Sequence, residues 1–218
     1  MSARKLRDRI LRRAKAAGAE PSTELVDGLV GYYSELAKWN AKVNLTAFSL
    51  DREGSDPSVD RLLIEPLLAS RHLTDGVESL IDVGSGGGSP AIPLKLACPE
   101  LALHMVEAKV RKSVFLRQVS RSLGLANTTV YTARFEELLI RSDLHEGMGA
   151  VSIRAVRLDS KVLMTLQAFL RPGGVVMHFT TGASHHAPPP PLVESGSFDL
   201  IPANRSRLVL FRKELIGR

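Results

Sequence analysis

The chain has 218 residues, of which 44% are hydrophobic, 24% charged and 5% aromatic. This length suits one compact domain with at most an extension, and the composition excludes disordered, collagen-like and disulfide-stapled proteins. The single cysteine, Cys98, can form neither an internal disulfide nor a cysteine-based metal cluster, as expected in a reducing cytosol. No apolar run is long enough to span a membrane, so the sequence predicts a soluble cytoplasmic protein without membrane contact.

The net charge of +6 arises mainly in residues 1–20, which hold seven basic and two acidic side chains. Leu6, Ile10 and Leu11 recur at helical spacing beside Ala14, which predicts a basic amphipathic helix. Such a helix could lie along a polyanion such as an RNA backbone. The alternative is a solvated face that only aids solubility. A mitochondrial transit peptide is a third interpretation, but it would be richer in serine than this segment.

Two further helices are expected before the first strand. Ser22 and Thr23 offer an N-cap, and apolar residues with a period near 3.6 follow to about residue 40. A polar break and a charged loop then precede a second apolar helix, expected from Val59 to Leu73. We therefore predict a helical extension over residues 1–75, followed by a second unit over residues 76–218.

Strands and helices alternate from residue 79 onward. Strands are expected at residues 79–83, 101–106, 128–131, 150–153 and 174–179, with helices at residues 90–97, 109–123, 135–140 and 158–170. This α/β alternation predicts a Rossmann-like, mostly parallel sheet with helices on both faces. Four prolines at 188–191 predict an extended loop over residues 182–194, and residues 205–213 are expected to form a last strand, which can run antiparallel.

A glycine-rich segment, Asp82-Val83-Gly84-Ser85-Gly86-Gly87-Gly88-Ser89-Pro90, joins the first expected strand to the following helix. Open parallel sheets bind ligands at this place, and glycines at 84, 86 and 88 let the backbone turn tightly and approach a ligand. A purely structural turn is the alternative. A P-loop is excluded because no Gly-Lys-Ser or Gly-Lys-Thr follows the glycines.

Acidic residues after the next two strands favour an adenosine-containing ligand. Glu107 ends the second strand 23 residues after Gly84, close to the spacing at which a carboxylate meets ribose hydroxyls. Arg134, Phe135 and Glu136 follow the third strand, where an acidic side chain and its neighbouring backbone can reach an adenine.

The charge around the glycine loop distinguishes between two ligand classes. Asp82, expected at the rim beside Ser85, would repel a pyrophosphate and suit a cation. We therefore predict S-adenosylmethionine, which carries a sulfonium and an ammonium group. An oxidoreductase that binds NAD or another nucleotide on the same sheet is the competing interpretation.

Three sequence blocks carry a resemblance to a known family. They are Trp39-Asn40 with Asn44-Leu45-Thr46, the glycine segment continued through Leu94, and Phe115-Leu116-Arg117-Gln118-Val119. Over roughly residues 30–180 the chain resembles the bacterial small-subunit ribosomal RNA methyltransferase G family, also called glucose-inhibited division protein B. The resemblance implies a class I methyltransferase fold, S-adenosylmethionine as cofactor, and methylation of a guanine N7 in 16S rRNA of the small ribosomal subunit.

The resemblance also implies an active site. It places cofactor contacts on the loop residues Asp82, Gly84, Ser85, Gly86 and Gly88 and on Glu107, Arg134, Phe135 and Glu136. Asn44, Arg61 and Arg154 match polar positions at the family's active-site mouth, and Arg154 is also expected beside the cofactor. We expect Arg154 to donate to guanine O6, Arg61 to hold a phosphate and Asn44 a base or ribose edge. Structural ion pairs are the alternative for both arginines. Leu62 and Thr181 stand where the family usually has histidine and lysine.

Several alternatives and absences complete these expectations. A class I methyltransferase acting on a small molecule or a protein is the main alternative, and a silent RNA-binding protein that kept the pocket is another. No histidine has ligand spacing beyond the pair His185 and His186, so we expect no metal. We expect the protein to bind RNA and not DNA, and a monomer is the default oligomeric state. Because few aromatic residues are available for stacking, the N-terminal helix is expected to supply phosphate contacts.

Overall fold

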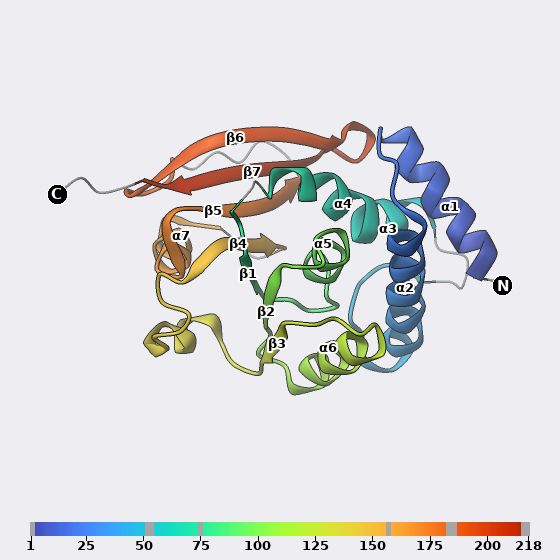
Figure 1. Ribbon diagram of the computed structural model, residues 1–218, viewed down its shortest axis with the longest axis horizontal. Helices are drawn as coiled ribbons and strands as arrows, with labels where there is room; N and C mark the ends of the chain where they lie inside the picture. The colour runs from blue at the N-terminus through green and yellow to red at the C-terminus, as the bar shows by residue number, and fades with distance from the viewer. Residues whose placement is uncertain (1–2, 51–54, 74–75, 156–157, 182–186, 215–218) are drawn as a thin grey trace.

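A computed structural model describes residues 3–50, 55–73, 76–155, 158–181 and 187–214 of the chain. Its centre is a seven-stranded sheet with the order β3-β2-β1-β4-β5-β7-β6 (Figure 1). The strands are β1 (Ser79–Val83), β2 (Ala102–Val106), β3 (Thr128–Tyr131), β4 (Met148–Arg154), β5 (Leu170–Thr181), β6 (Leu192–Ile201) and β7 (Ser206–Lys213). Strands β1 to β5 run parallel, and β7 runs antiparallel to both β5 and β6. The predicted Rossmann-like sheet and its antiparallel last strand are confirmed.

Helical segments precede the sheet and connect its strands. Before the sheet lie α1 (Ala3–Ala16), α2 (Thr23–Val43), α3 (Asp56–Val59), a π-helical turn η1 (Asp60–Ile64), α4 (Glu65–Ala69) and a 3-10 turn η2 (Ser70–His72). The connecting segments are α5 (Ala91–Ala97), α6 (Val110–Ser122), the 3-10 segment η3 (Phe135–Ile140), α7 (Ser160–Gln167) and η4 (Pro202–Asn204).

The sheet separates two apolar layers. In Figure 1, α7 lies on one side of the sheet, while α4, α5 and α6 lie on the other, with α2 and then α1 beyond them. One buried cluster joins Leu6 and Ile10 of α1 with Leu80 and Met105 of the sheet. The predicted extension therefore shares its core with the sheet that follows it.

Helix α2 forms as its sequence predicts. The Ser22 side chain accepts a hydrogen bond from the backbone N–H of Leu25 (3.2 Å), which satisfies a donor of the first turn. The helix ends at Asn44, whose left-handed backbone (φ 54°) turns the chain away. Its buried face holds Val26, Leu29, Tyr32, Tyr33 and Leu36.

Helix α1 has a narrower apolar stripe than predicted. Leu6, Ile10 and Ala14 are buried, but Leu11 is 40% exposed, because it lies about 100° around the helix from Ile10 and leaves the packed face.

Carboxylates of the same chain neutralise much of the positive charge of α1. The pairs are Arg7 with Asp27, Arg9 and Arg12 with Asp56 (3.5 and 3.0 Å), and Arg13 with Asp60. Four guanidinium groups of α1 are therefore already paired with carboxylates, which counts against the expectation that this helix lies along a polyanion.

The structure corrects several element boundaries. The loop predicted over residues 182–194 reaches into strand β6, which begins at Leu192; residues 182–186 lie outside the described part. The helix predicted to reach residue 170 ends at Gln167, since Leu170 already pairs with β4. The helix expected over 59–73 contains the π-helical turn and ends in a 3-10 turn.

Candidate functional site

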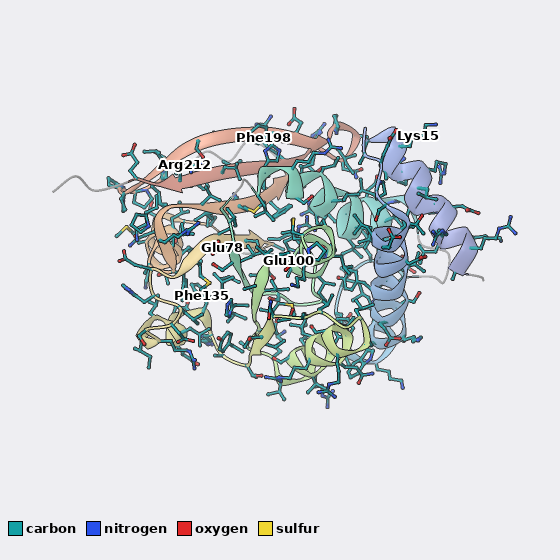
Figure 2. The ribbon with its side chains drawn as sticks, in the orientation of Figure 1. Lys15, Glu78, Glu100, Phe135, Phe198 and Arg212 are labelled. Carbon is teal, nitrogen blue, oxygen red and sulfur yellow. The ribbon has the colours of Figure 1, made fainter. Side chains whose placement is uncertain are left out.

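A pocket of about 290 Å³ opens where β1, β2 and β3 end. Parallel strands present their carboxyl ends at one edge of a sheet, so residues far apart in sequence meet there. The lining residues are Gly84, Val106, Glu107, Ala108, Ala133, Arg134, Phe135 and Glu136. The structure thus brings together the predicted ribose-side carboxylate, the first glycine and the predicted adenine-side segment. Phe135 is labelled in Figure 2.

The Glu107 carboxylate is held in a fixed orientation by backbone donors. Its Oε2 accepts a hydrogen bond from the Gly86 N–H (2.9 Å), and its Oε1 accepts one from the Lys109 N–H (2.8 Å). Each carboxylate oxygen can accept a second hydrogen bond, so the group can also bind a pair of hydroxyls. This geometry suits a vicinal diol such as that of a ribose.

Asp82 lies beneath the glycine loop and not at its rim, so that part of the prediction is wrong. The residue is on β1 between β2 and β4, and it is 1% exposed. Its Oδ1 accepts a hydrogen bond from Ser152 Oγ (2.5 Å), and burial raises the pKa of the carboxyl group. No described residue donates a hydrogen bond to the buried Oδ2. This unpaired oxygen beside the glycine loop fits a ligand that carries a cationic donor.

The other loop residues serve the turn itself. Ser85 is buried, and its hydroxyl donates to the Asp82 carbonyl (3.0 Å). Gly86 is left-handed, with φ +52°, and a Cβ there would lie 3.7 Å from the Gly84 carbonyl oxygen. Gly88 has φ +89°, and a Cβ there would lie 2.5 Å from Cδ1 of Ile92. Gly88 therefore permits close packing of α5 against the loop.

The helical extension contacts the glycine loop and supports it. The Tyr32 hydroxyl of α2 donates to the Gly87 carbonyl (2.7 Å), and the ring is fully buried. The carbonyl oxygen of Leu45 lies 3.3 Å from the position that a Cβ on Gly87 would take. The Asn40 side chain fixes this segment, since its Oδ1 accepts hydrogen bonds from the backbone N–H groups of Leu45 (2.7 Å) and Thr46 (2.9 Å). Asn44 is therefore presented, exposed, next to the loop.

Arg61 and Arg154 meet at one buried carboxylate. Glu65 Oε2 accepts hydrogen bonds from Arg61 Nη1 (2.8 Å) and Arg154 Nη2 (3.2 Å). Arg154 also donates from Nη1 to the Arg61 carbonyl (2.6 Å) and to Ser89 Oγ (3.1 Å), and it lies over the ring of Phe179. The ion pairs considered as an alternative for these arginines are thus present.

Burial governs the titration of this cluster. The Arg154 side chain is 8% exposed, and burial lowers its pKa to about 10, opposed by the Glu65 charge. Burial raises the pKa of Glu65, opposed by Arg154 and Arg61. Glu65 Oε1 and Arg154 Nε are buried without a hydrogen-bond partner among the described residues. A polar ligand could satisfy both atoms.

Sequence reasoning missed three residues of this site. Glu65 follows Arg61 by four residues in a helical segment, a spacing that signals an ion pair. The apolar period of the second helix predicts Tyr32 only as a buried residue of the helix core. No local pattern reveals that its hydroxyl reaches Gly87. Ser89, whose hydroxyl donates to the Leu62 carbonyl (2.8 Å), was expected only as a member of the glycine-rich segment.

No helix within the described ranges is long and apolar enough to cross a membrane. No group of three or more metal-ligating side chains occurs in the same ranges, and the pair His185 and His186 lies outside them.

The chain matches a known protein-family model over most of its length. The family model of GidB, rRNA small subunit methyltransferase G, matches residues 26–187. Proteins named ribosomal RNA small subunit methyltransferase G are similar in sequence. That of Roseiflexus sp. RS-1 is 38% identical over 68% of this chain and 62% of its own length. That of Acetivibrio thermocellus is 32% identical over 78% and 69%. The match thus spans less than two thirds of the Roseiflexus relative.

Solved structures support the fold. A SAM-dependent methyltransferase from Aquifex aeolicus superposes with a TM-score of 0.54, at 13% identity, over 72% of this chain and 93% of its own. A putative O-methyltransferase from Klebsiella pneumoniae gives a TM-score of 0.58, at 12% identity, over 84% and 90%. At these identities the likeness establishes the class I methyltransferase architecture that the sequence predicted.

Proposed function

The chain belongs to the rRNA small subunit methyltransferase G family, and from this premise we propose that it methylates N7 of one guanine in 16S rRNA of the small ribosomal subunit. S-adenosylmethionine is the proposed cofactor, and the cytoplasm is the proposed place of action. The observation that carries the proposal is the extent of the family match, because residues 26–187 include most of α2, the glycine loop, the pocket and the arginine cluster.

The residues in and beside the pocket suit the chemical groups of the proposed cofactor. Glu107 would hold the ribose hydroxyls, since backbone donors fix its carboxylate and leave acceptor capacity. The start of η3 would border the adenine, with Arg134, Phe135 and Glu136. The unpaired Asp82 Oδ2 and the loop from Gly84 would serve the ammonium end of the methionine part. When bound, the cofactor supplies an electrophilic methyl group on a sulfonium.

Guanine N7 suits a site without a general base. N7 carries a free lone pair at the major-groove edge, so it can accept a methyl group without prior loss of a proton. The chain's contribution is then to position the base and to exclude other orientations. This agrees with a cluster in which the arginines are held by an ion pair and none is arranged to remove a proton.

The three candidate substrate residues would divide these tasks. Asn44, exposed beside the glycine loop, would contact a base or ribose edge. Arg61, with 21% of its side chain exposed, would hold a phosphate while Glu65 orients it. Arg154 donates from both Nη atoms within the fold, and its buried Nε, which has no partner among the described residues, would donate to guanine O6.

Base mapping tests the proposed reaction. Purified protein is incubated with tritiated S-adenosylmethionine and small ribosomal subunits from a strain that lacks the endogenous enzyme. We expect label at one guanine of 16S rRNA, released as 7-methylguanine. Label in ribosomal protein or in small molecules, or calorimetry showing binding of dinucleotides but not of the methyl donor, would contradict the proposal.

A further inference from the structure

Helix α6 carries positive charge that no carboxylate among the described residues neutralises. The stretch from residue 109 to 121 has no acidic residue and holds Lys109, Arg111, Lys112, Arg117 and Arg121. Arg117 donates to the Val130 carbonyl (3.1 Å) and to Thr132 Oγ1 (2.7 Å), which stabilises β3 without neutralising the charge. Within the described ranges, no ion pair involves any of these five side chains.

Exposed apolar residues accompany this charge. Val110 is 65% exposed and Val114 is 44% exposed, and with Arg117 and Arg121 they recur every three or four residues along one helix face. The opposite face holds the buried Phe115 and is packed against the fold. The exposed parts of these two valines lie between cations, where they can contact sugars and bases.

Intramolecular stability does not explain where the cations lie. Arg111 and Lys112 occupy the first turn of α6 and Lys109 precedes it, where the helix dipole disfavours positive charge. A stabilising sequence would place Asp or Glu there, and the first turn has neither. A polyanionic partner along this face would remove the repulsion.

The charged face begins at the mouth of the cofactor pocket. Ala108 lines the pocket, and the Lys109 N–H donates to the same Glu107 carboxylate that we assign to the ribose. Helix α1 lies elsewhere: Figure 2 shows Lys15, near the end of α1, and Phe135, in the pocket lining, on opposite sides of the molecule. A nucleic acid bound along α6 would therefore pass beside the site.

We propose that the exposed face of α6, formed by Val110, Arg111, Val114, Arg117 and Arg121, is the docking surface for the RNA that carries the target base. The basic side chains bind phosphates, and the two valines contact riboses or unstacked bases. This inference rests on the proposed function, and it assigns the electrostatic contact to α6 in place of α1.

A matched pair of charge-removal variants tests the docking surface. Arg111→Gln/Arg121→Gln removes two exposed cations from α6, and Arg4→Gln/Lys15→Gln removes two exposed cations from α1. Binding of the full chain to unmodified 16S rRNA and to small subunits is measured across salt concentrations. We expect the α6 variant to bind about tenfold more weakly and its log–log salt slope to fall by roughly 1.5, because two phosphate contacts are lost. The α1 variant should change both by less than about twofold.

Further readouts separate docking from folding and chemistry. Arg111→Lys/Arg121→Lys keeps both charges and should restore the salt slope, and calorimetry should give every variant the same affinity for S-adenosylmethionine. Wild-type salt dependence in the α6 glutamine variant, or an equal loss in the α1 variant, would overturn the inference. If the wild type methylates rRNA and the α6 variant binds and methylates it equally well, the docking surface is contradicted and the proposed function is not. A wild type that binds rRNA through α6 but transfers no methyl group to it contradicts the proposed function and supports docking.

Discussion

At the scale of single residues, Glu65 holds two arginines in place at the site. Its carboxylate is fully buried and accepts hydrogen bonds from both guanidinium groups. We expect Glu65→Gln to reduce the free energy of unfolding by about 3 kcal/mol, because it leaves the buried Arg154 without its counter-charge. Arg61→Gln should cost about 1 kcal/mol or less, since Arg61 is partly solvated. Urea unfolding at pH 7 compares them, and equal losses would contradict this assignment.

Arg154 is expected to promote methyl transfer through the fixed position of its guanidinium group. Arg154→Lys keeps a positive charge but cannot reach the Arg61 carbonyl, Ser89 and Glu65 together, because lysine lacks the planar fork. We predict that kcat for methyl transfer falls by about 100-fold while the affinity for S-adenosylmethionine stays within twofold. Calorimetry and single-turnover kinetics measure the two quantities. Wild-type turnover in this variant would remove Arg154 from the mechanism.

His178 on β5 makes stability depend on acidity. Burial lowers the pKa of its imidazole from 6.5 to about 4, so below pH 6.5 the unfolded chain binds a proton that the folded chain does not. As the pH falls from 6.5 to 4, this histidine should therefore lower the free energy of unfolding by about 3 kcal/mol. Urea unfolding at pH 7 and pH 4.5 should show a smaller drop for His178→Gln than for wild type. His145→Gln, at an exposed position, is the control, and an unchanged drop in both variants would contradict the prediction.

The residues of the pocket were predictable from sequence, but their partners were not. Glu107 and the segment 134–136 follow strands at informative spacings, so their meeting at one edge follows from a parallel sheet. The burial of Asp82 and the pairing of Arg154 with Glu65 depend on how segments about 70 and 89 residues apart pack together. No local pattern encodes such distant contacts.

At the scale of elements, α2 and the glycine loop are connected by one hydrogen bond. Tyr32→Phe removes the hydroxyl that donates to the Gly87 carbonyl. We expect a loss of about 1 kcal/mol in stability and a roughly fivefold weaker affinity for S-adenosylmethionine, because the loop loses its support. Calorimetry and urea unfolding measure both effects.

Tyr33→Phe is the matched control for this hydrogen bond. It removes a buried hydroxyl that contacts Ser58 Oγ (2.8 Å). This variant should lose comparable stability and keep its cofactor affinity. Equal loss of affinity in both variants would show that general destabilisation, and not the loop contact, is responsible.

Edge elements and irregular turns were the least predictable parts of the fold. Strand β6 pairs on one side only and exposes most of its residues, so it lacks the apolar alternation that reveals a strand. The π-helical turn η1 keeps an apolar helical pattern in sequence, and only the backbone shows it. Buried strands such as β1 and β4 were found because both of their faces are apolar.

At the scale of the whole molecule, the helical extension and the sheet share one core. A chain that begins at residue 76 would keep α5 and α6 but lose Leu6, Ile10 and the other extension residues that share one buried cluster with Leu80 and Met105. We predict that this fragment shows no cooperative urea unfolding and no binding of S-adenosylmethionine by calorimetry. A fragment that unfolds cooperatively and binds the cofactor would contradict this and support two independent domains.

The hydrogen bond from Tyr32 to Gly87 also limits how this binding site can be transplanted. The donor lies 55 residues before the acceptor. A designer who grafted only the glycine segment onto another methyltransferase scaffold would leave a carbonyl oxygen without its donor. The smallest portable unit is therefore the helix together with the loop, and a chimera between family members should exchange the two as a pair.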